Sequence, residues 1–409
     1  MQDLQTAMRE SYATHPAFRF EQDSWVVSDE LIDAFDEAYR QARDAGSGLP
    51  RTESQALLQR CHDALAAIFD EFRRQSDDEY EVAFANELQA AVRHILDYEW
   101  NWYSRQTAAG SVAPVSPSAR QQFADLQEDR HYFGRLSPEA AAKIQKLSAR
   151  HVERFRANAA NGKVTRQDLS TGAAADIAAI CDVLNREFKR LGVLDAVSAY
   201  SGRKLRVTGL ALELSVPQAT WWKNAIPGLE RPANTLYMHL DEAITHPKSI
   251  VYVSDVTEQN GPTSASPRVY DELALEPLQE LIGRVVGTVG NAEGSPLKAY
   301  YAKTYHQSSS SEQFRRHFMR LPERLRFNSH IGWDVNPGSE FEGDFESVER
   351  QMTGPAGTYL IFDGARLFHR GGLMQSGERV ALQVIFGTAA NARLLWPKRV
   401  IGTLLGRRH

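Results

Sequence analysis

The spacing of the apolar residues changes near residue 203, and this change constrains the fold more than any other feature of the sequence. Before it, apolar residues recur at every third or fourth position, as on one face of an α-helix. After it, residues 205–216 alternate in the manner of a β-strand, and Gly209 predicts a bulge within that strand. We therefore expect residues 1–202 to form a mostly helical part that packs on a β core.

The expected helices of this first part begin with capping signals. Ser28 and Asp29 precede one apolar run, and Ser137 precedes another that has Pro138 at its first helical position. The expected helices cover about residues 31–39, 53–72, 77–103, 138 onwards and 173–191.

Short runs rich in β-branched and aromatic residues follow, and turn residues such as Asn260-Gly261-Pro262 separate them. Several short strands bounded by turns are typical of a β-sandwich or jelly roll. Helical spacing returns in residues 270–350, which we interpret as an insertion into the core. The expected organisation is therefore α+β, with a core over residues 203–395, a tail over residues 396–409, and strands over residues 235–241, 249–256, 357–362 and 379–386.

Composition and charge exclude several classes of protein. The net charge of −5 over 409 residues argues against a general nucleic-acid-binding protein, which would carry a basic excess. The sequence lacks an apolar run of about eighteen residues, and its start lacks the pattern of a signal peptide. The two cysteines, Cys61 and Cys181, favour a reducing compartment or no dependence on disulfides. We expect a cytoplasmic protein without a nucleic acid or membrane partner, and its oligomeric state is left open.

A histidine and an aspartate stand two positions apart in the strand expected over residues 235–241. Side chains two apart project from the same face of a strand, so His239 and Asp241 are expected to point together, with Tyr237 on the same side. An imidazole and a carboxylate placed in this way can supply two ligands to one metal ion. By itself, however, such a pair is more often a hydrogen-bonded His–Asp pair with no metal.

A third possible ligand and a carboxylate-binding cation follow further along the chain. His369 stands after the apolar run over residues 357–362 and just before Gly371-Gly372, which permit positive φ. Two histidines and one carboxylate form the facial triad of non-haem Fe(II) oxygenases, which leaves three positions on the metal open. Arg379 opens the next strand and can bind a carboxylate through two parallel hydrogen bonds.

In this order, the motifs resemble the phytanoyl-CoA dioxygenase family of the Fe(II)/2-oxoglutarate-dependent oxygenase superfamily. The resemblance covers about residues 203–390 and rests on His239-Leu240-Asp241, the run from Lys248 to Pro262, His369 and Arg379. It implies a cupin-like double-stranded β-helix in which His239, Asp241 and His369 hold Fe(II). It also implies that Arg379 binds the distal carboxylate of the co-substrate 2-oxoglutarate. The implied reaction uses O2 to hydroxylate a C–H bond of a small or medium-sized metabolite, with release of succinate and CO2.

Other side chains are weaker candidates for the same site. Tyr237 and Gln383 share strand faces with His239 and Arg379, respectively, and Lys223 could reach the carboxylate of the co-substrate. The arginines between residues 315 and 326 could attract an anionic substrate, although a charged helical face is more often simply solvated.

Two other functions are compatible with the sequence. One is a catalytically silent β-helix protein that binds a ligand or a partner, and the other is a cupin-type metalloenzyme that does not use 2-oxoglutarate. The complete triad argues against the first, because a silent relative would tend to lose a ligand, and Arg379 argues against the second. The sequence indicates neither the substrate nor a choice between hydroxylation, desaturation and cyclisation.

Overall fold

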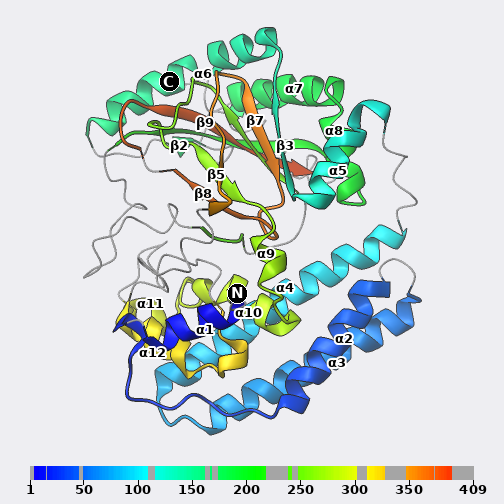
Figure 1. Ribbon diagram of the computed structural model, residues 1–409, viewed down its shortest axis with the longest axis vertical. Coiled ribbons are helices and arrows are strands. Elements are labelled where there is room, and N and C mark those ends of the chain that lie inside the picture. The colour runs from blue at the N-terminus through cyan, green and yellow to red at the C-terminus, as the bar shows by residue number, and fades with distance from the viewer. Residues whose placement is uncertain are drawn as a thin grey trace. The chain divides into compact units, whose positions relative to one another are not determined.

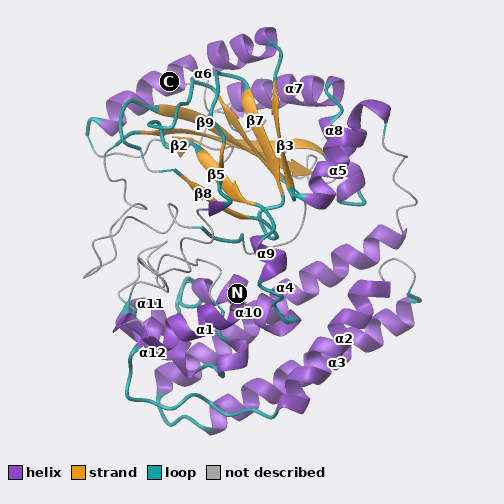
Figure 2. Ribbon diagram, in the orientation of Figure 1, coloured by secondary structure: helices purple, strands orange, loops and turns teal. Residues whose placement is uncertain are grey.

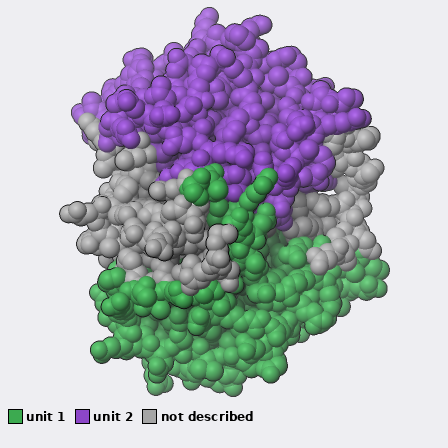
Figure 3. Space-filling model, in the orientation of Figure 1, with its two compact units in different colours: residues 1–110, 221–244, 268–348 green, residues 111–220, 245–267, 349–409 purple. Residues whose placement is uncertain are grey.

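The structure (Figure 1) is a computed structural model. It describes residues 4–14, 16–45, 49–108, 116–161, 166–167, 174–217, 238–241, 247–301, 311–327, 347–372 and 374–388. The chain divides into two compact units, which Figure 3 shows in different colours. The helical unit comprises residues 1–110, 221–244 and 268–348, and the β unit comprises residues 111–220, 245–267 and 349–409.

Two antiparallel sheets form the β unit. Their strands are β1 (His131–Arg135), β2 (Arg166–Gln167), β3 (Arg206–Ser215), β4 (Lys248–Tyr252), β5 (Thr263–Ser266), β6 (Arg350–Gln351), β7 (Thr358–Phe362), β8 (Phe368–Gly371) and β9 (Arg379–Gly387). The larger sheet has the order β1-β7-β4-β9-β3-β2, and the smaller sheet has the order β6-β5-β8. From β4 onwards the chain passes repeatedly between them: β4, β7 and β9 lie in the larger sheet, and β5, β6 and β8 in the smaller. This winding is the topology of a double-stranded β-helix, or jelly roll, and the predicted fold class is confirmed.

Helices cover the outer face of the larger sheet (Figures 1 and 2). These helices are α5 (Arg120–Glu128), α6 (Pro138–Ala159), α7 (Ala174–Arg190) and α8 (Val193–Tyr200). The short helix η3 (Pro117–Ala119) directly precedes α5. Every second residue of β9, from Val380 to Phe386, is buried in one apolar core with residues of these helices such as Leu184. Burial of each large apolar side chain contributes about 1.5–3 kcal/mol. The sheet is therefore fixed from its outer side.

The alternate residues of β9 face the smaller sheet, because successive side chains of a strand point to opposite faces. Ala381 packs there with Tyr252 of β4, Phe362 of β7 and Ala265 of β5, so that the two sheets enclose a second, smaller apolar core. Arg379, Gln383 and Ile385 share this inner face of β9.

The helical unit is built around a buried helix. All nine residues of α10 (Pro277–Val285) are buried, and the carboxylate of Asp36 accepts a hydrogen bond from the backbone N–H of Leu278 at 2.8 Å, which caps the N-terminus of α10. Burial raises the pKa of Asp36.

The other elements of the helical unit are α1 (Leu4–Thr14), η1 (Pro16–Phe18), α2 (Asp29–Ala45), α3 (Arg51–Arg74), α4 (Glu79–Ala108), α9 (Val269–Glu272), η5 (Val286–Thr288), α11 (Pro296–Tyr300), α12 (Glu312–Arg320) and η7 (Glu323–Leu325). Among the residues described above, no helix has both the length and the apolar character needed to cross a membrane.

The two units divide the chain at places other than the expected boundary at residue 202. Helices α5 to α8 belong to the β unit, because their apolar residues share the core of the larger sheet. Residues 268–348, which include most of the expected insertion, belong to the helical unit, because α10 packs against α2 and α4.

Several local predictions agree with the described elements. The hydroxyl of Ser137 accepts a hydrogen bond from the backbone N–H of Ala140 at 3.3 Å, and α6 begins at Pro138. The pairing of β3 with β9 shifts register between Val207 and Gly209, which is the predicted bulge. Strands β4, β7 and β9 correspond to expected strands, whereas β1, β5 and β8 were not expected. Of the strand expected over residues 235–241, only residues 238–241 are described.

Candidate metal centre

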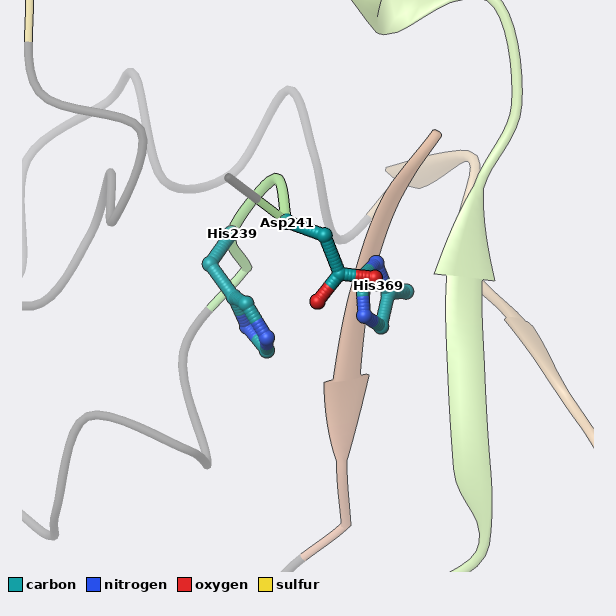
Figure 4. Close-up of side chains that lie close together, drawn as sticks. All are labelled: His239, Asp241 and His369. Carbon is teal, nitrogen blue, oxygen red and sulfur yellow. The ribbon is translucent and has the colours of Figure 1, made fainter. Parts of the chain in front are cut away.

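Three side chains that can ligate a metal lie close together in the structure (Figure 4). One ligand atom from each of His239, Asp241 and His369 lies within 4.8 Å of those of the other two. His369 comes from β8 and is only 7% exposed, and His239 and Asp241 are half-buried. The structure therefore brings together the three residues that the sequence singled out.

The ring of His369 is oriented by its immediate surroundings. Its Nδ1 lies 2.9 Å from the carbonyl oxygen of Leu367. Because a carbonyl oxygen can only accept, Nδ1 must carry the proton, which leaves the lone pair of Nε2 for a metal. The ring also packs against Phe362, with ring centroids 4.8 Å apart. The hydrogen bond from Nδ1 to Leu367 is of the kind by which proteins usually orient a metal-binding histidine, in which the ring nitrogen that does not bind the metal donates to a nearby acceptor.

The donor set fits ferrous iron. Two imidazoles and one carboxylate suit a mononuclear non-haem iron site and leave coordination positions for other ligands. Neither cysteine belongs to this group of side chains, since Cys61 lies on α3 and Cys181 on α7, where both are buried. Burial raises the pKa of the Cys61 thiol to about 12, which disfavours the thiolate that a metal would require.

Arg379 opens β9 on its inner face and is only 9% exposed. Its Nη1 donates to the carbonyl oxygen of Gly261, and its Nη2 donates to the hydroxyl of Ser215 at 3.3 Å. Its buried Nε has no hydrogen-bond partner among the described residues. None of the described carboxylates forms an ion pair with Arg379, so this buried cation is suited to an anionic ligand.

The contacts of Arg379 depend on a tight turn. Gly261 has a φ of +62°, and a Cβ placed on it would lie 2.5 Å from the carbonyl oxygen of Gly372, so a larger residue does not fit.

The buried hydroxyl of Tyr252 holds the chain just after this turn. It accepts a hydrogen bond from the backbone N–H of Thr263 at 2.8 Å and donates to the carbonyl oxygen of Met352 at 2.9 Å. Burial raises the pKa of Tyr252, which keeps this hydroxyl protonated.

The weaker candidates have different outcomes. Gln383 lies on the same face of β9 as Arg379, but its side chain is exposed. Tyr237 and Lys223 lie outside the described residues. Arginines of the basic cluster have partners within the helical unit: Arg324 pairs with Asp29 at 3.1 Å, Arg316 with Glu312 at 2.7 Å and Arg320 with Glu81 at 3.1 Å. These pairs account for much of the positive charge that the sequence concentrates there.

Sequence reasoning missed the residues that surround the predicted ones. Ser215 is the register partner of Arg379, and Phe362 packs on His369. The Asn260-Gly261-Pro262 turn was visible as a turn, but no local pattern indicates that its carbonyl group would accept from Arg379. Such contacts depend on strand pairing, which spacing alone does not specify.

No protein-family model and no curated protein matches the sequence. Solved structures show weak likenesses. EctD from S. alaskensis in its apoform is 14% identical, with 68% of this chain and 79% of that chain covered and a TM-score of 0.38. The non-heme alpha ketoglutarate dependent carbocyclase SnoK from nogalamycin biosynthesis is 12% identical over 68% and 85%, with a TM-score of 0.35. AviO1 from Streptomyces viridochromogenes is 15% identical over 68% and 97%, also with a TM-score of 0.35.

The cofactors expected from the sequence occur in two further structures of the S. alaskensis protein. One has bound Fe, and the other has 2-oxoglutarate and 5-hydroxyectoine; both are 14% identical to this chain, with TM-scores of 0.37 and 0.38. Because all of these TM-scores are below 0.5, the fold assignment rests on the strand order of the β unit. The function proposed below rests on this chain's own side chains.

Proposed function

We propose that this chain is an Fe(II)- and 2-oxoglutarate-dependent dioxygenase, similar to the phytanoyl-CoA dioxygenase family, that hydroxylates a C–H bond of a small or medium-sized metabolite. The observation that carries the proposal is the approach of ligand atoms of His239, Asp241 and His369 to within 4.8 Å of one another. The buried guanidinium of Arg379 supports it, because a dicarboxylate co-substrate provides the anion that this cation lacks among the described residues.

Each of the chain's own groups has a distinct role in this proposal. His239, Asp241 and His369 hold the metal from one side. Arg379 binds and orients the distal carboxylate of 2-oxoglutarate. The apolar core around Phe362 and Leu360 keeps water away from the part of the inner face beside His369. When bound, iron, 2-oxoglutarate and O2 supply the oxidant for the C–H bond, with succinate and CO2 as by-products.

The carboxylate of Asp241 bears on the type of reaction. Because this side chain occupies the third protein position of the triad, a halide has no vacant position there. We therefore favour hydroxylation, with desaturation or ring formation as related outcomes, over halogenation.

We place the substrate along the exposed end of the inner face of β9. Gln383 is exposed, and Ile385 is 53% exposed although it is apolar. Ile385 pairs with Lys248, which pairs with Phe362, the residue whose ring packs on His369. At about 4.8 Å per strand, Ile385 lies about 10 Å from Phe362 across the sheet. A small molecule bound near His369 can therefore reach both exposed side chains of β9.

Binding of the two cofactors is the direct test of the proposal. Anaerobic addition of Fe(II) and 2-oxoglutarate to the full-length protein should produce a weak visible charge-transfer band. The band should be lost in His369→Ala and kept in the control His151→Gln, which changes a buried histidine that contacts Asp176 at 2.9 Å outside the triad. A folded wild-type protein that gives no band would contradict the proposal. Iron binding without a band on adding 2-oxoglutarate would instead favour a cupin-type metalloenzyme.

A second experiment addresses the substrate. Candidate metabolites are screened for stimulated release of succinate in the presence of O2. For the compound that stimulates, Gln383→Leu should raise the KM, while the charge-transfer band with 2-oxoglutarate stays unchanged. An altered band with an unaltered KM would place Gln383 at the co-substrate instead.

A further inference from the structure

Strand β8 carries the candidate ligand His369 on one face and Arg370 on the other. Arg370 donates through Nε to Oε1 of Glu349 at 2.8 Å and through Nη2 to Oε2 of the same carboxylate. The hydroxyl of Ser264 in β5 also donates to Glu349. Glu349 directly precedes β6, so this one carboxylate joins all three strands of the smaller sheet.

The three residues are more buried than an ordinary surface ion pair. The Glu349 side chain is 8% exposed and that of Arg370 is 20% exposed, while Ser264 is buried. Two parallel charge-assisted hydrogen bonds fix both the distance and the orientation of the two groups. We call Ser264, Glu349 and Arg370 the carboxylate clamp.

The carboxylate clamp lies directly beside His369 in the strand register. Ser264 pairs with Arg370, and the next pair along the same two strands is Ala265 with His369. Because side chains alternate between the faces of a strand, a shift of β8 by one residue would turn His369 away from the inner face. β8 has only four residues, so its own backbone hydrogen bonds resist such a shift weakly.

We propose that the carboxylate clamp positions His369 for metal binding, with Glu349 as the positioning residue. The contacts of the His369 ring with Leu367 and Phe362 orient the imidazole relative to its own backbone and to β7. The clamp fixes the backbone of β8 relative to β5 and β6. Together they hold Nε2 in place before a metal arrives, which lowers the cost of binding the metal. This inference rests on the proposed function.

A matched control distinguishes positioning from general stability. Glu187 of α7 is also 8% exposed and binds Arg190 through two hydrogen bonds, at 3.0 and 2.8 Å. It also accepts a hydrogen bond from the backbone N–H of Ser137 at 2.6 Å. Glu187 thus has the same chemistry in the same unit, but it is not beside a triad residue in sequence or in the strand register.

The experiment measures Co(II) binding to the full-length protein by its visible d–d absorption, whose intensity and position report the coordination geometry. Glu349→Gln should weaken Co(II) binding by about 10- to 100-fold and change the spectrum at saturation. Glu187→Gln should lower the Tm and leave both the affinity and the spectrum unchanged. Arg370→Gln should repeat the effect of Glu349→Gln, and the double variant should lose little more than either single variant, because both act through one pair.

The outcomes separate this inference from the proposed function. If the wild-type protein binds neither Co(II) nor Fe(II), the metal site itself, and with it the proposed function, is contradicted. Wild-type protein that binds Co(II), with an unchanged affinity and spectrum in Glu349→Gln, would overturn the positioning role and leave the proposed function standing. An equal loss of affinity in Glu187→Gln would also overturn it, because the effect would then follow from stability.

Discussion

Replacing Arg379 by methionine tests the co-substrate site most directly, since methionine keeps an unbranched chain similar to the aliphatic stem of arginine and removes the charge and all of its N–H donors. The structure sets the scale of the effect. Nη1 and Nη2 each donate one N–H, to Gly261 and Ser215, and Nε has no partner in the part of the chain that the structure describes, so one or two hydrogen bonds are available to a carboxylate. A hydrogen bond to a charged group contributes about 1.5–3 kcal/mol. The substitution should therefore weaken the binding free energy of 2-oxoglutarate by about 2–4 kcal/mol, which raises its Kd by about 30- to 1000-fold.

The assay is an anaerobic titration of the Fe(II)-loaded protein with 2-oxoglutarate, followed by the charge-transfer band. The midpoint should move to higher concentration in Arg379→Met, while the amplitude at saturation should be kept, because the triad is intact. Arg156→Met is the control, since Arg156 forms a half-exposed ion pair with Glu378 in the same unit. An unchanged midpoint in Arg379→Met would refute the reasoning and would mean that another cation binds the carboxylate.

Three further predictions concern stability. Arg284→Met should destabilise the protein by about 3–5 kcal/mol in urea unfolding, because Arg284 is fully buried at 2.8 Å from the carboxylate of Glu99, which would lose its counter-charge; a change below about 1 kcal/mol would contradict this. Burial lowers the pKa of His317 to about 4, so the unfolded state binds the additional proton as the pH falls from about 6.5 to 4. Between about pH 6.5 and 4 the free energy of unfolding of the wild type should fall by about 3 kcal/mol more than that of His317→Phe. Parallel pH profiles of the urea midpoints of the two proteins would contradict this prediction. Gly134→Ala should lower the Tm, because its Cβ would lie 2.2 Å from the ring of Tyr359 and such overpacking costs about 1–3 kcal/mol; an unchanged Tm would show that the ring moves away freely.

Local signals in the sequence predicted the elements whose cause is local. The Ser137 cap and Pro138 define the start of α6, because their effect acts within one helical turn. The bulge at Gly209 and the strands β4, β7 and β9 follow from alternation and from a glycine inside an apolar run. β5 was missed because Thr263 to Ser266 are small residues without an apolar pattern, and β8 because four residues are too few to show a period.

The division into units is a property of tertiary packing. The sequence predicts residues 270–350 as an insertion into the β core, because they interrupt its strands. The structure assigns most of them to the helical unit, since α10 is buried on all sides and packs there against α2 and α4. Even the polar residues Glu280 and Arg284 of α10 are buried, but the sequence of this helix does not say which elements enclose it.

The sequence by itself determined the types of group at the candidate site: His239 and Asp241 two apart, His369 before two glycines, and Arg379 at the start of an apolar strand. Only the tertiary structure decided that His239, Asp241 and His369 meet, that Arg379 is buried on the inner face of β9, and which neighbours orient these groups. The physical reason is that ligand spacing within a segment follows from backbone period, which is local. The pairing of Arg379 with Ser215 and of Arg370 with Ser264 depends on strand register, which is set by the whole apolar core at once.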